Sequence, residues 1–226
     1  MTTSEAPAAR ANHTAVWTGT EMIVFGGYAT NGDMLGTGGR YTPSPEAWAP
    51  LGGNRPSARQ HHSAVWTGRH MLVWGGVDGN GNPASGGKRY DPATSQWSAM
   101  ASGGPERSYM LSAWTGTRWI LYGGSVGGPP LNDGMMYTEA TDSWEEIPAD
   151  TSRSAEVAKA VWTGAEFVVW TYGSGGRRFN PQKGTWSDVA PLPSLPGVWA
   201  YPSVVWTGDS MIVYGGGSMA NGAIYR

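Results

Sequence analysis

Residues 61–76 read HHSAVWTGRHMLVWGG, and most of this stretch occurs again elsewhere in the chain. Close copies stand at 13–27 (HTAVWTGTEMIVFGG), 110–124 (MLSAWTGTRWILYGG) and 202–216 (PSVVWTGDSMIVYGG). The Trp before the Thr-Gly pair recurs at spacings of 49, 48, 48 and 44 residues, at Trp17, Trp66, Trp114, Trp162 and Trp206. Such a regular period indicates a repeat architecture in which each repeat forms one structural unit.

Three further features keep their place within the repeat. A Gly pair follows the Trp, and its second member stands ten residues after it, at Gly27, Gly76, Gly124 and Gly216. A later aromatic residue stands at Tyr41, Tyr90, Tyr137, Phe179 and Tyr225. Seven residues after the first four of these comes another Trp, at Trp48, Trp97, Trp144 and Trp186. The constant step of seven indicates paired strands, whereas the variable stretch after the Gly pair indicates a loop.

Each repeat contains four candidate strands separated by turn residues. In the second repeat the first candidate is SAVW at 63–66, which the Thr-Gly turn closes, and the second is the apolar run MLVW at 71–74. A continuous apolar run fits a strand buried on both faces. The third candidate contains Tyr90 and the fourth contains Trp97. Four short strands in every 48 residues, without helical periodicity, predict an all-β fold made of propeller blades.

The Gly pair, the following Tyr and the Trp seven residues later resemble the kelch motif, over nearly the whole chain. The resemblance implies four-stranded blades in which the first strand is innermost and Tyr and Trp fill the wedge between blades. The Gly pair lets the chain turn close to the neighbouring blade, because Gly adopts positive φ without a Cβ clash. Kelch propellers bind proteins, bind sugars and in some cases host enzymes, so the fold alone does not specify a function.

We therefore expect one β-propeller domain over residues 1–226. The approximate repeats are 10–56, 57–104, 105–150, 151–196, and 197–226 together with 1–9. The fifth repeat has only three candidate strands, so we predict a five-bladed monomer in which the N- and C-terminal segments share the last blade. The alternatives are a chain cut from a longer propeller, since kelch rings more often have six or seven blades, and an open ring whose apolar faces are buried in a dimer.

The composition excludes several kinds of partner and site. A formal net charge of −2 gives no support for nucleic-acid binding, which needs a basic patch. The absence of Cys excludes disulfides, thiolate metal sites and a cysteine nucleophile. The N-terminal MTTSEAPAARANH has no apolar region, and no run approaches 18 apolar residues, so we expect neither a signal peptide nor a membrane partner. Extracellular, periplasmic and cytoplasmic locations all stay open.

The strongest functional candidates lie at the mouth of the central channel. The resemblance implies that the segment before each first strand and the loop after the Gly pair open onto one face there. In the first three repeats, Arg stands seven residues before the first-strand Trp. His, Asn or Tyr stands four or five residues before the same Trp. These groups differ between repeats, as a ligand site requires. We predict a ligand-binding site formed by Arg10, His13, Arg59, His62, Arg107, Tyr109, Arg153, Trp199 and Tyr201.

These candidates also have structural interpretations. Arginines in register can bond backbone carbonyls of the next blade, or they can bind carboxylates and phosphates as planar forks. One His per blade is too sparse for a metal site, so we expect no metal and no cofactor. His70 follows the Thr-Gly turn, and we expect a solvated turn residue there. Asp78–Asn82 resembles the start of a calcium loop, but Asn-Gly turns explain it better because the loop's Gly and Glu are missing.

Three functions are compatible with these patterns. The first, which we favour, is a kelch-type binding module for a protein segment or a glycan, with the arginines facing acidic groups and the aromatic residues giving flat contact surfaces. The second is a sugar-type isomerase or lyase at the same mouth, with His13 or His62 as acid or base. The third is an engineered or excised propeller scaffold without a ligand of its own.

Overall fold

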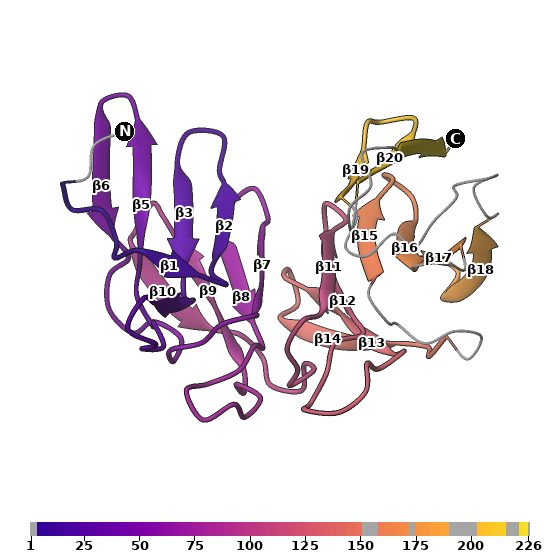
Figure 1. Ribbon diagram of the computed structural model, residues 1–226, viewed down its shortest axis with the longest axis horizontal. Helices are drawn as coiled ribbons and strands as arrows, with labels where there is room; N and C mark the ends of the chain where they lie inside the picture. Colours follow the sequence, from indigo (N-terminus) through magenta and orange to yellow (C-terminus); the bar gives the residue numbers. More distant parts are fainter. Residues whose placement is uncertain (1–3, 151–157, 172–174, 190–202, 216–221, 226) are drawn as a thin grey trace.

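The computed structural model describes residues 4–150, 158–171, 175–189, 203–215 and 222–225. Its strands form five antiparallel sheets of three or four strands and one two-stranded ribbon. The five sheets follow one another in chain order around an arc, from indigo to yellow in Figure 1, as the blades of a five-bladed β-propeller. The predicted all-β propeller fold is therefore confirmed. Within the described ranges, none of the elements is a helix long and apolar enough to cross a membrane.

Each blade draws its strands from one repeat, and the strands pair in chain order. The first blade consists of β2 (Thr14–Trp17), β3 (Met22–Phe25), β5 (Gly38–Pro43) and β6 (Glu46–Pro50). The second consists of β7 (Ser63–Trp66), β8 (Met71–Trp74), β9 (Gly87–Asp91) and β10 (Gln96–Ala99). The third consists of β11 (Leu111–Trp114), β12 (Arg118–Tyr122), β13 (Gly134–Thr138) and β14 (Ser143–Ile147). The fourth and fifth consist of β15 (Ala158–Trp162), β16 (Phe167–Thr171), β17 (Gly175–Asn180) and β18 (Thr185–Val189), then β19 (Ser203–Trp206), β20 (Met211–Tyr214) and β21 (Gly222–Tyr225).

The Thr-Gly turn sets the register of the inner two strands. In the second blade the Thr67 N–H donates to the His70 carbonyl at 3.0 Å, and the Thr67 hydroxyl accepts from the His70 N–H at 3.0 Å. Gly68 between them has φ of +96°, which favours glycine. The turn places Trp66 opposite Met71, and the corresponding turns of the other blades place their Trp in the same register.

Aromatic and aliphatic side chains fill the space between blades. Ile23 and Phe25 of the first blade pack in one buried cluster with Met71, Val73 and Trp97 of the second. Full burial of one such side chain contributes roughly 1.5–3 kcal/mol. In the first four blades the fourth-strand Trp lies beside the third-strand aromatic, with ring centroids 4.9–5.2 Å apart. The constant seven-residue step in the sequence thus corresponds to a paired Tyr–Trp or Phe–Trp contact.

The Gly pair stands where the chain passes the next blade. Gly75 has φ of +66°, and a Cβ added to it would lie 2.4 Å from the carbonyl oxygen of Arg107 in the third blade. Gly76 has φ of +96°, and a Cβ added to it would lie 2.5 Å from the carbonyl oxygen of Gln60 in its own blade. Contacts below 3.0 Å leave no room for a side chain, so both positions require glycine.

The sharing of the last blade by the two terminal segments stays a prediction, because residues 1–3 lie outside the described residues and residues 4–9 form no strand. β1 (Arg10–Ala11) pairs with β4 (Tyr28–Ala29) in the first blade. Pro7 lies next to this blade, because a Cβ added to Gly39 would be 3.2 Å from Pro7 Cδ. Figure 1 shows the first and last blades apart at the two ends of the arc. The pairing of Arg10–Ala11 agrees with the predicted start of the first repeat at residue 10.

Replacing Gly75 with Ala should destabilise the protein far more than replacing Gly68 with Ala. Both glycines have positive φ, so backbone strain costs each variant about 1–2 kcal/mol. A Cβ at Gly68 meets nothing within 4 Å, whereas a Cβ at Gly75 meets the Arg107 carbonyl. We expect Gly75→Ala to lower the free energy of unfolding by at least about 3 kcal/mol in urea titrations. Equal losses in the two variants would contradict the close-approach role of the Gly pair.

Candidate functional site

The segments before the first strands lie together at one end of the inner strands. The first strands of successive blades contact one another, from β2 through β7, β11 and β15 to β19, so they line the inner side of the arc. In the first three blades the preceding segment pairs with the segment after the Gly pair: Arg10 with Ala29, Gln60 with Val77 and Ser108 with Ser125. We call the region formed by residues 10–13, 59–62 and 107–110 the channel mouth.

Arg59 is buried inside its blade instead of facing the channel. Only 2% of the residue is exposed, and Nη1 donates to the carbonyls of Gly75 at 3.0 Å and Gly86 at 2.9 Å. Burial lowers the pKa of Arg59 to about 10, so the guanidinium stays charged at neutral pH. The side chain therefore ties the end of β8 to the start of β9.

Arg10 and Arg107 make the corresponding bonds in their own blades. Arg10 Nη1 donates to the carbonyls of Gly26 and Thr37, at 3.0 and 2.7 Å. Arg107 Nη1 donates to the carbonyl of Gly123 at 3.2 Å, and its fork binds the Asp133 carboxylate at 2.8 Å through each nitrogen. Each arginine therefore bonds carbonyls of its own blade. The sequence had suggested bonds to carbonyls of the next blade instead.

The backbone of the same arginines joins neighbouring blades. The Gly27 N–H donates to the Arg59 carbonyl, and the Gly76 N–H donates to the Arg107 carbonyl, each at 2.8 Å. We call this arrangement the Arg–Gly joint: an arginine, the first Gly of its own blade and the second Gly of the preceding blade. A joint of this kind links the first blade to the second and the second to the third.

Three residues beside the joints have an unusual backbone conformation. Asn12, His61 and Tyr109 occupy the same place in the first three repeats, and all have φ between +53° and +58°. The His61 N–H donates to the Asn12 carbonyl at 3.3 Å, and the Tyr109 N–H donates to the His61 carbonyl at 3.1 Å. Positive φ is a genuine outlier for a residue as large as Tyr, and such strain clusters at functional sites. We call these three residues the mouth row.

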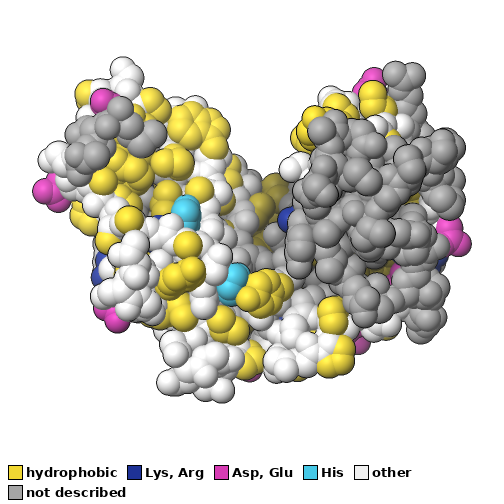
Figure 2. Space-filling model, viewed as in Figure 1, with side chains coloured by type: hydrophobic (Ala, Val, Ile, Leu, Met, Phe, Trp, Pro, Cys, Tyr) yellow, Lys and Arg dark blue, Asp and Glu magenta, His cyan; other side chains and the backbone are white. Residues whose placement is uncertain are grey.

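The side chains of the mouth row form a connected polar and aromatic surface. The Asn12 amide nitrogen lies 2.9 Å from both Gln60 Oε1 and His61 Nε2. An amide nitrogen only donates, so His61 Nε2 accepts and the neutral ring carries its proton on Nδ1. The His61 and Tyr109 rings stack with centroids 4.0 Å apart and planes at 28°. Tyr109 is 63% exposed, and Figure 2 shows histidine side chains at the surface of this face beside hydrophobic ones.

His62 is a packing residue between the first two blades. It is 6% exposed, its Nε2 lies 2.7 Å from the Thr14 hydroxyl, and its ring meets Phe25 edge-on. Burial, followed by the nearby Arg59, lowers the pKa of His62 to about 3. The ring is therefore neutral and shielded from a ligand in the channel, and it does not support the acid–base role considered for an enzyme.

The remaining predicted site residues divide into two groups. His13 is exposed next to the mouth row. Arg153, Trp199 and Tyr201 lie outside the described residues. Asn12 and His61 were not among the predicted site residues, although they hold the same repeat position as Tyr109 and lie beside it. The aligned repeats already show this shared position, but nothing in the sequence marks the positive φ of the three residues.

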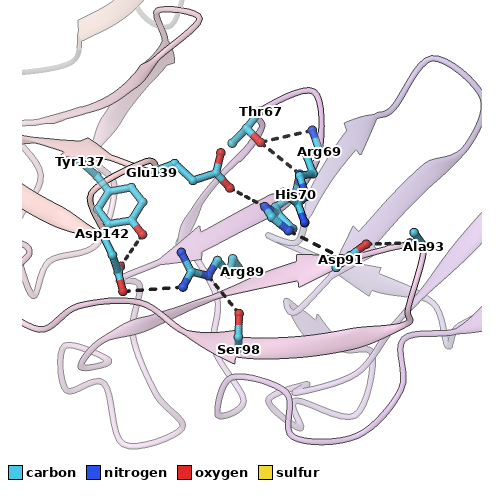
Figure 3. A network of polar contacts seen from close by, with 10 residues as sticks. All are labelled: Thr67, Arg69, His70, Arg89, Asp91, Ala93, Ser98, Tyr137, Glu139 and Asp142. Carbon is cyan, nitrogen blue, oxygen red and sulfur yellow. Dashed lines mark hydrogen bonds and ion pairs between the residues drawn. The ribbon is translucent and has the colours of Figure 1, made fainter.

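His70 was expected to be a solvated turn residue, and this is wrong. The side chain is 15% exposed, and its Nδ1 lies 2.5 Å from Glu139 Oε1 of the third blade (Figure 3). Its Nε2 lies 4.0 Å from Asp91 Oδ2, while Arg89 Nη2 lies 3.7 Å from the Asp142 carboxylate. The network joins the second and third blades on the side of the Thr-Gly turns. A polar pocket of about 530 Å³ opens there, lined by Arg69, His70, Arg89, Glu139 and Ala140.

The Asp78–Asn82 loop uses its carboxylate for its own turn. Asp78 Oδ1 accepts from the N–H groups of Asn80 and Asn82, each at 2.9 Å. Across the described ranges, no group of three or more His, Cys, Asp and Glu side chains is arranged to hold a metal ion. The local bonds agree with the interpretation of this loop as Asn-Gly turns.

Comparison with known protein families identifies the repeats of this chain. The family model described as the KLHDC2/KLHL20/DRC7 Kelch-repeats domain matches residues 44–216, which is more than half of the chain. The matched range contains every strand of the second, third and fourth blades and the first two strands of the fifth. No curated protein matches the chain.

Arg59→Met should destabilise the protein strongly. The substitution leaves the carbonyls of Gly75 and Gly86 without the donor that Arg59 supplies, and each buried unpaired group costs about 1–3 kcal/mol. We expect a total loss of about 2–5 kcal/mol in urea unfolding. Arg118→Met is the matched control, because the Arg118 side chain is 39% exposed and its ion pair with Glu145 is worth less than about 1 kcal/mol. Equal losses would show that the Arg–Gly joint contributes little.

His62→Met should reduce the acid sensitivity of the fold. The pKa of His62 is lowered in the folded state, so its stabilising effect is complete above the unfolded value of 6.5 and is lost as the pH falls toward 3. One such proton changes the slope of stability with pH by at most about 1.4 kcal/mol per unit. Met110 holds this position in the third repeat, so Met fits a blade interface of this kind. Melting temperatures between pH 7 and 4 that fall equally in both proteins would contradict this role.

Proposed function

Because the chain belongs to the kelch-repeat family, we propose that this protein-interaction module binds a protein segment at its channel mouth. The mouth row is the observation that carries the proposal. It holds a bulky Tyr in a strained conformation, 63% exposed, and stacks it on a His that is itself held by an amide. An exposed aromatic residue whose orientation is fixed in advance loses little entropy on binding, as is typical of interface anchors.

The charge of the mouth indicates which segment would bind. Arg10, Arg59 and Arg107 are engaged with groups of their own blades, so they do not support the expected preference for acidic ligands. Partial burial lowers the pKa of His61, which keeps the ring neutral at pH 7. The mouth row offers an aromatic platform and amide groups. These suit a segment with an aromatic residue or Pro for the ring and free backbone groups for the amides.

Tyr109→Gly should remove binding without destabilising the fold. Glycine adopts φ of +58° without strain, so we expect the variant to be at least as stable as the wild type in thermal unfolding. Peptides selected from a phage-displayed random library on the immobilised wild-type chain should bind Tyr109→Gly at least about tenfold more weakly. Arg69→Ala, on the opposite face, should bind them as the wild type does.

Selected peptides that bind both proteins equally would contradict the proposal. If no peptide is selected and binding to a glycan array depends on Tyr109, the ligand of this site is a carbohydrate. That result would overturn the choice of a protein segment. Tyr109→Phe separates ring stacking from the hydroxyl, and we expect it to retain most of the affinity.

A further inference from the structure

His61 is the residue of the channel mouth at which three blades meet. Its Nε2 lies 2.9 Å from the Asn12 amide nitrogen of the first blade, and its ring stacks on the Tyr109 ring of the third. Its backbone is held on both sides, because its N–H donates to the Asn12 carbonyl and its carbonyl accepts from the Tyr109 N–H. A proton added to the ring would therefore act on the surrounding side chains while the ring keeps its place.

The neutral ring fixes the direction of two amide groups. Asn12 Nδ2 donates one hydrogen to His61 Nε2 and the other to Gln60 Oε1, each at 2.9 Å. Within the described part of the chain, Asn12 Oδ1 and Gln60 Nε2 have no hydrogen-bond partner, and Asn12 is exposed. With His61 neutral, the mouth therefore offers a ligand an acceptor on Asn12 and a donor on Gln60.

A proton on His61 Nε2 reverses this arrangement. Nε2 becomes a donor, so Asn12 has to turn its Oδ1 toward the ring. That oxygen then also faces Gln60, whose amide turns in its place to donate from Nε2. Both hydrogen bonds are made again in the opposite direction, and the groups left for a ligand are a donor on Asn12 and an acceptor on Gln60. One proton thus exchanges donor and acceptor at both amides.

The other groups of the mouth leave this exchange to the amides. A protonated His61 still stacks on Tyr109, as a cation on an aromatic face, so the platform is kept. The residues of the channel mouth, all of them described, include no Asp or Glu, so the proton gains no ion pair within the mouth. The charged and titratable side chains that the three blades place there are Arg10, His13, Arg59, His62, Arg107 and Tyr109. Burial lowers the pKa of His61 below its ordinary value of 6.5, so the exchange takes place in more acidic solution.

We propose that the channel mouth is a pH-sensitive binding site at which protonation of His61 releases the protein segment that is bound at neutral pH. This inference rests on the proposed function, because it concerns the regulation of the same site. A segment that donates a backbone N–H to Asn12 Oδ1 meets a donor in that place once His61 is protonated, so the bond is lost and two donors face each other. The affinity falls with the fraction of neutral His61, and it is about tenfold weaker one pH unit below the midpoint of the His61 titration.

An NMR titration of the ligand-free chain tests the switch by itself. The His61 ring should carry its proton on Nδ1 in the neutral form and titrate with a midpoint below pH 6.5. The side-chain NH₂ signals of Asn12 and Gln60 should shift with the same midpoint. Asn12→Asp should raise that midpoint by at least about one pH unit, because a carboxylate only accepts hydrogen bonds and favours the charged ring. Asp, like Asn, tolerates the left-handed conformation of position 12.

Calorimetric titrations with peptides test the release. The probes are peptides selected on the wild-type chain at pH 7.5 that depend on Tyr109, have blocked termini and contain no Asp, Glu or His. They should bind the wild type about tenfold more weakly one pH unit below the His61 midpoint than at pH 7.5. His61→Asn should bind them equally at the two pH values, and Asn fits there because it holds the same position in the first repeat. His13→Asn is the matched control and should keep the pH dependence of the wild type.

The possible failures are distinguishable. Tyr109-dependent peptides that bind the wild type equally at both pH values would overturn the pH switch and leave the proposed function intact. PH dependence that disappears in His13→Asn but persists in His61→Asn would assign the effect to the wrong residue and overturn it as well. Amide signals of Asn12 and Gln60 that do not follow the His61 titration would overturn the exchange of donor and acceptor, whether or not a peptide binds. The absence of any Tyr109-dependent peptide at pH 7.5 would overturn the proposed function and the release together.

Discussion

The arrangement of the first three blades depends on the Arg–Gly joint. The arginine side chain holds the carbonyl of the first Gly in its own blade, while its backbone carbonyl accepts the N–H of the second Gly in the preceding blade. Both glycines must lack a Cβ, because backbone oxygens occupy the space where it would be. One residue thereby fixes the end of its own second strand and the distance to its neighbour. The backbone thus sets the spacing of the blades, and the Trp and Tyr side chains fill the space between them.

The joint also explains why the mouth row can be strained and varied. The mouth-row residues stand two positions after the arginines, so the joint fixes their location. Their backbone hydrogen bonds run from one blade to the next. Those bonds require a left-handed conformation but no particular side chain. The same place is therefore Asn, His and Tyr in successive repeats. A rigid frame with variable side chains is the arrangement that a binding site needs, because surrounding structure compensates for the strain.

The sequence predicted the strands, the Gly pairs and the Tyr–Trp contacts because each depends on residues within one repeat. It did not decide whether Arg59 faces a ligand or its own blade, since the same spacing suits both. Only the position of the Gly86 carbonyl, at the end of a loop of variable length, settles that direction. His70 and Glu139 are 69 residues apart and meet across a blade boundary, so no local pattern could pair them. The assignment of residues 1–9 to the last blade rests on a count of strands around the whole ring and not on a pattern within one repeat, so it stays a prediction.

The two faces of the propeller use their polar groups in opposite ways. On the side of the Thr-Gly turns, charged side chains join the second and third blades directly, through His70 with Glu139 and Arg89 with Asp142. Those side chains are engaged with one another, so a ligand would have to break ion pairs that hold blades together. At the channel mouth, backbone hydrogen bonds connect the blades in addition to the side-chain contacts of the mouth row, so these connections do not depend on the side chains alone. Binding at the mouth can therefore change these side chains without loosening the blades, which favours the mouth over the turn side as the place of recognition.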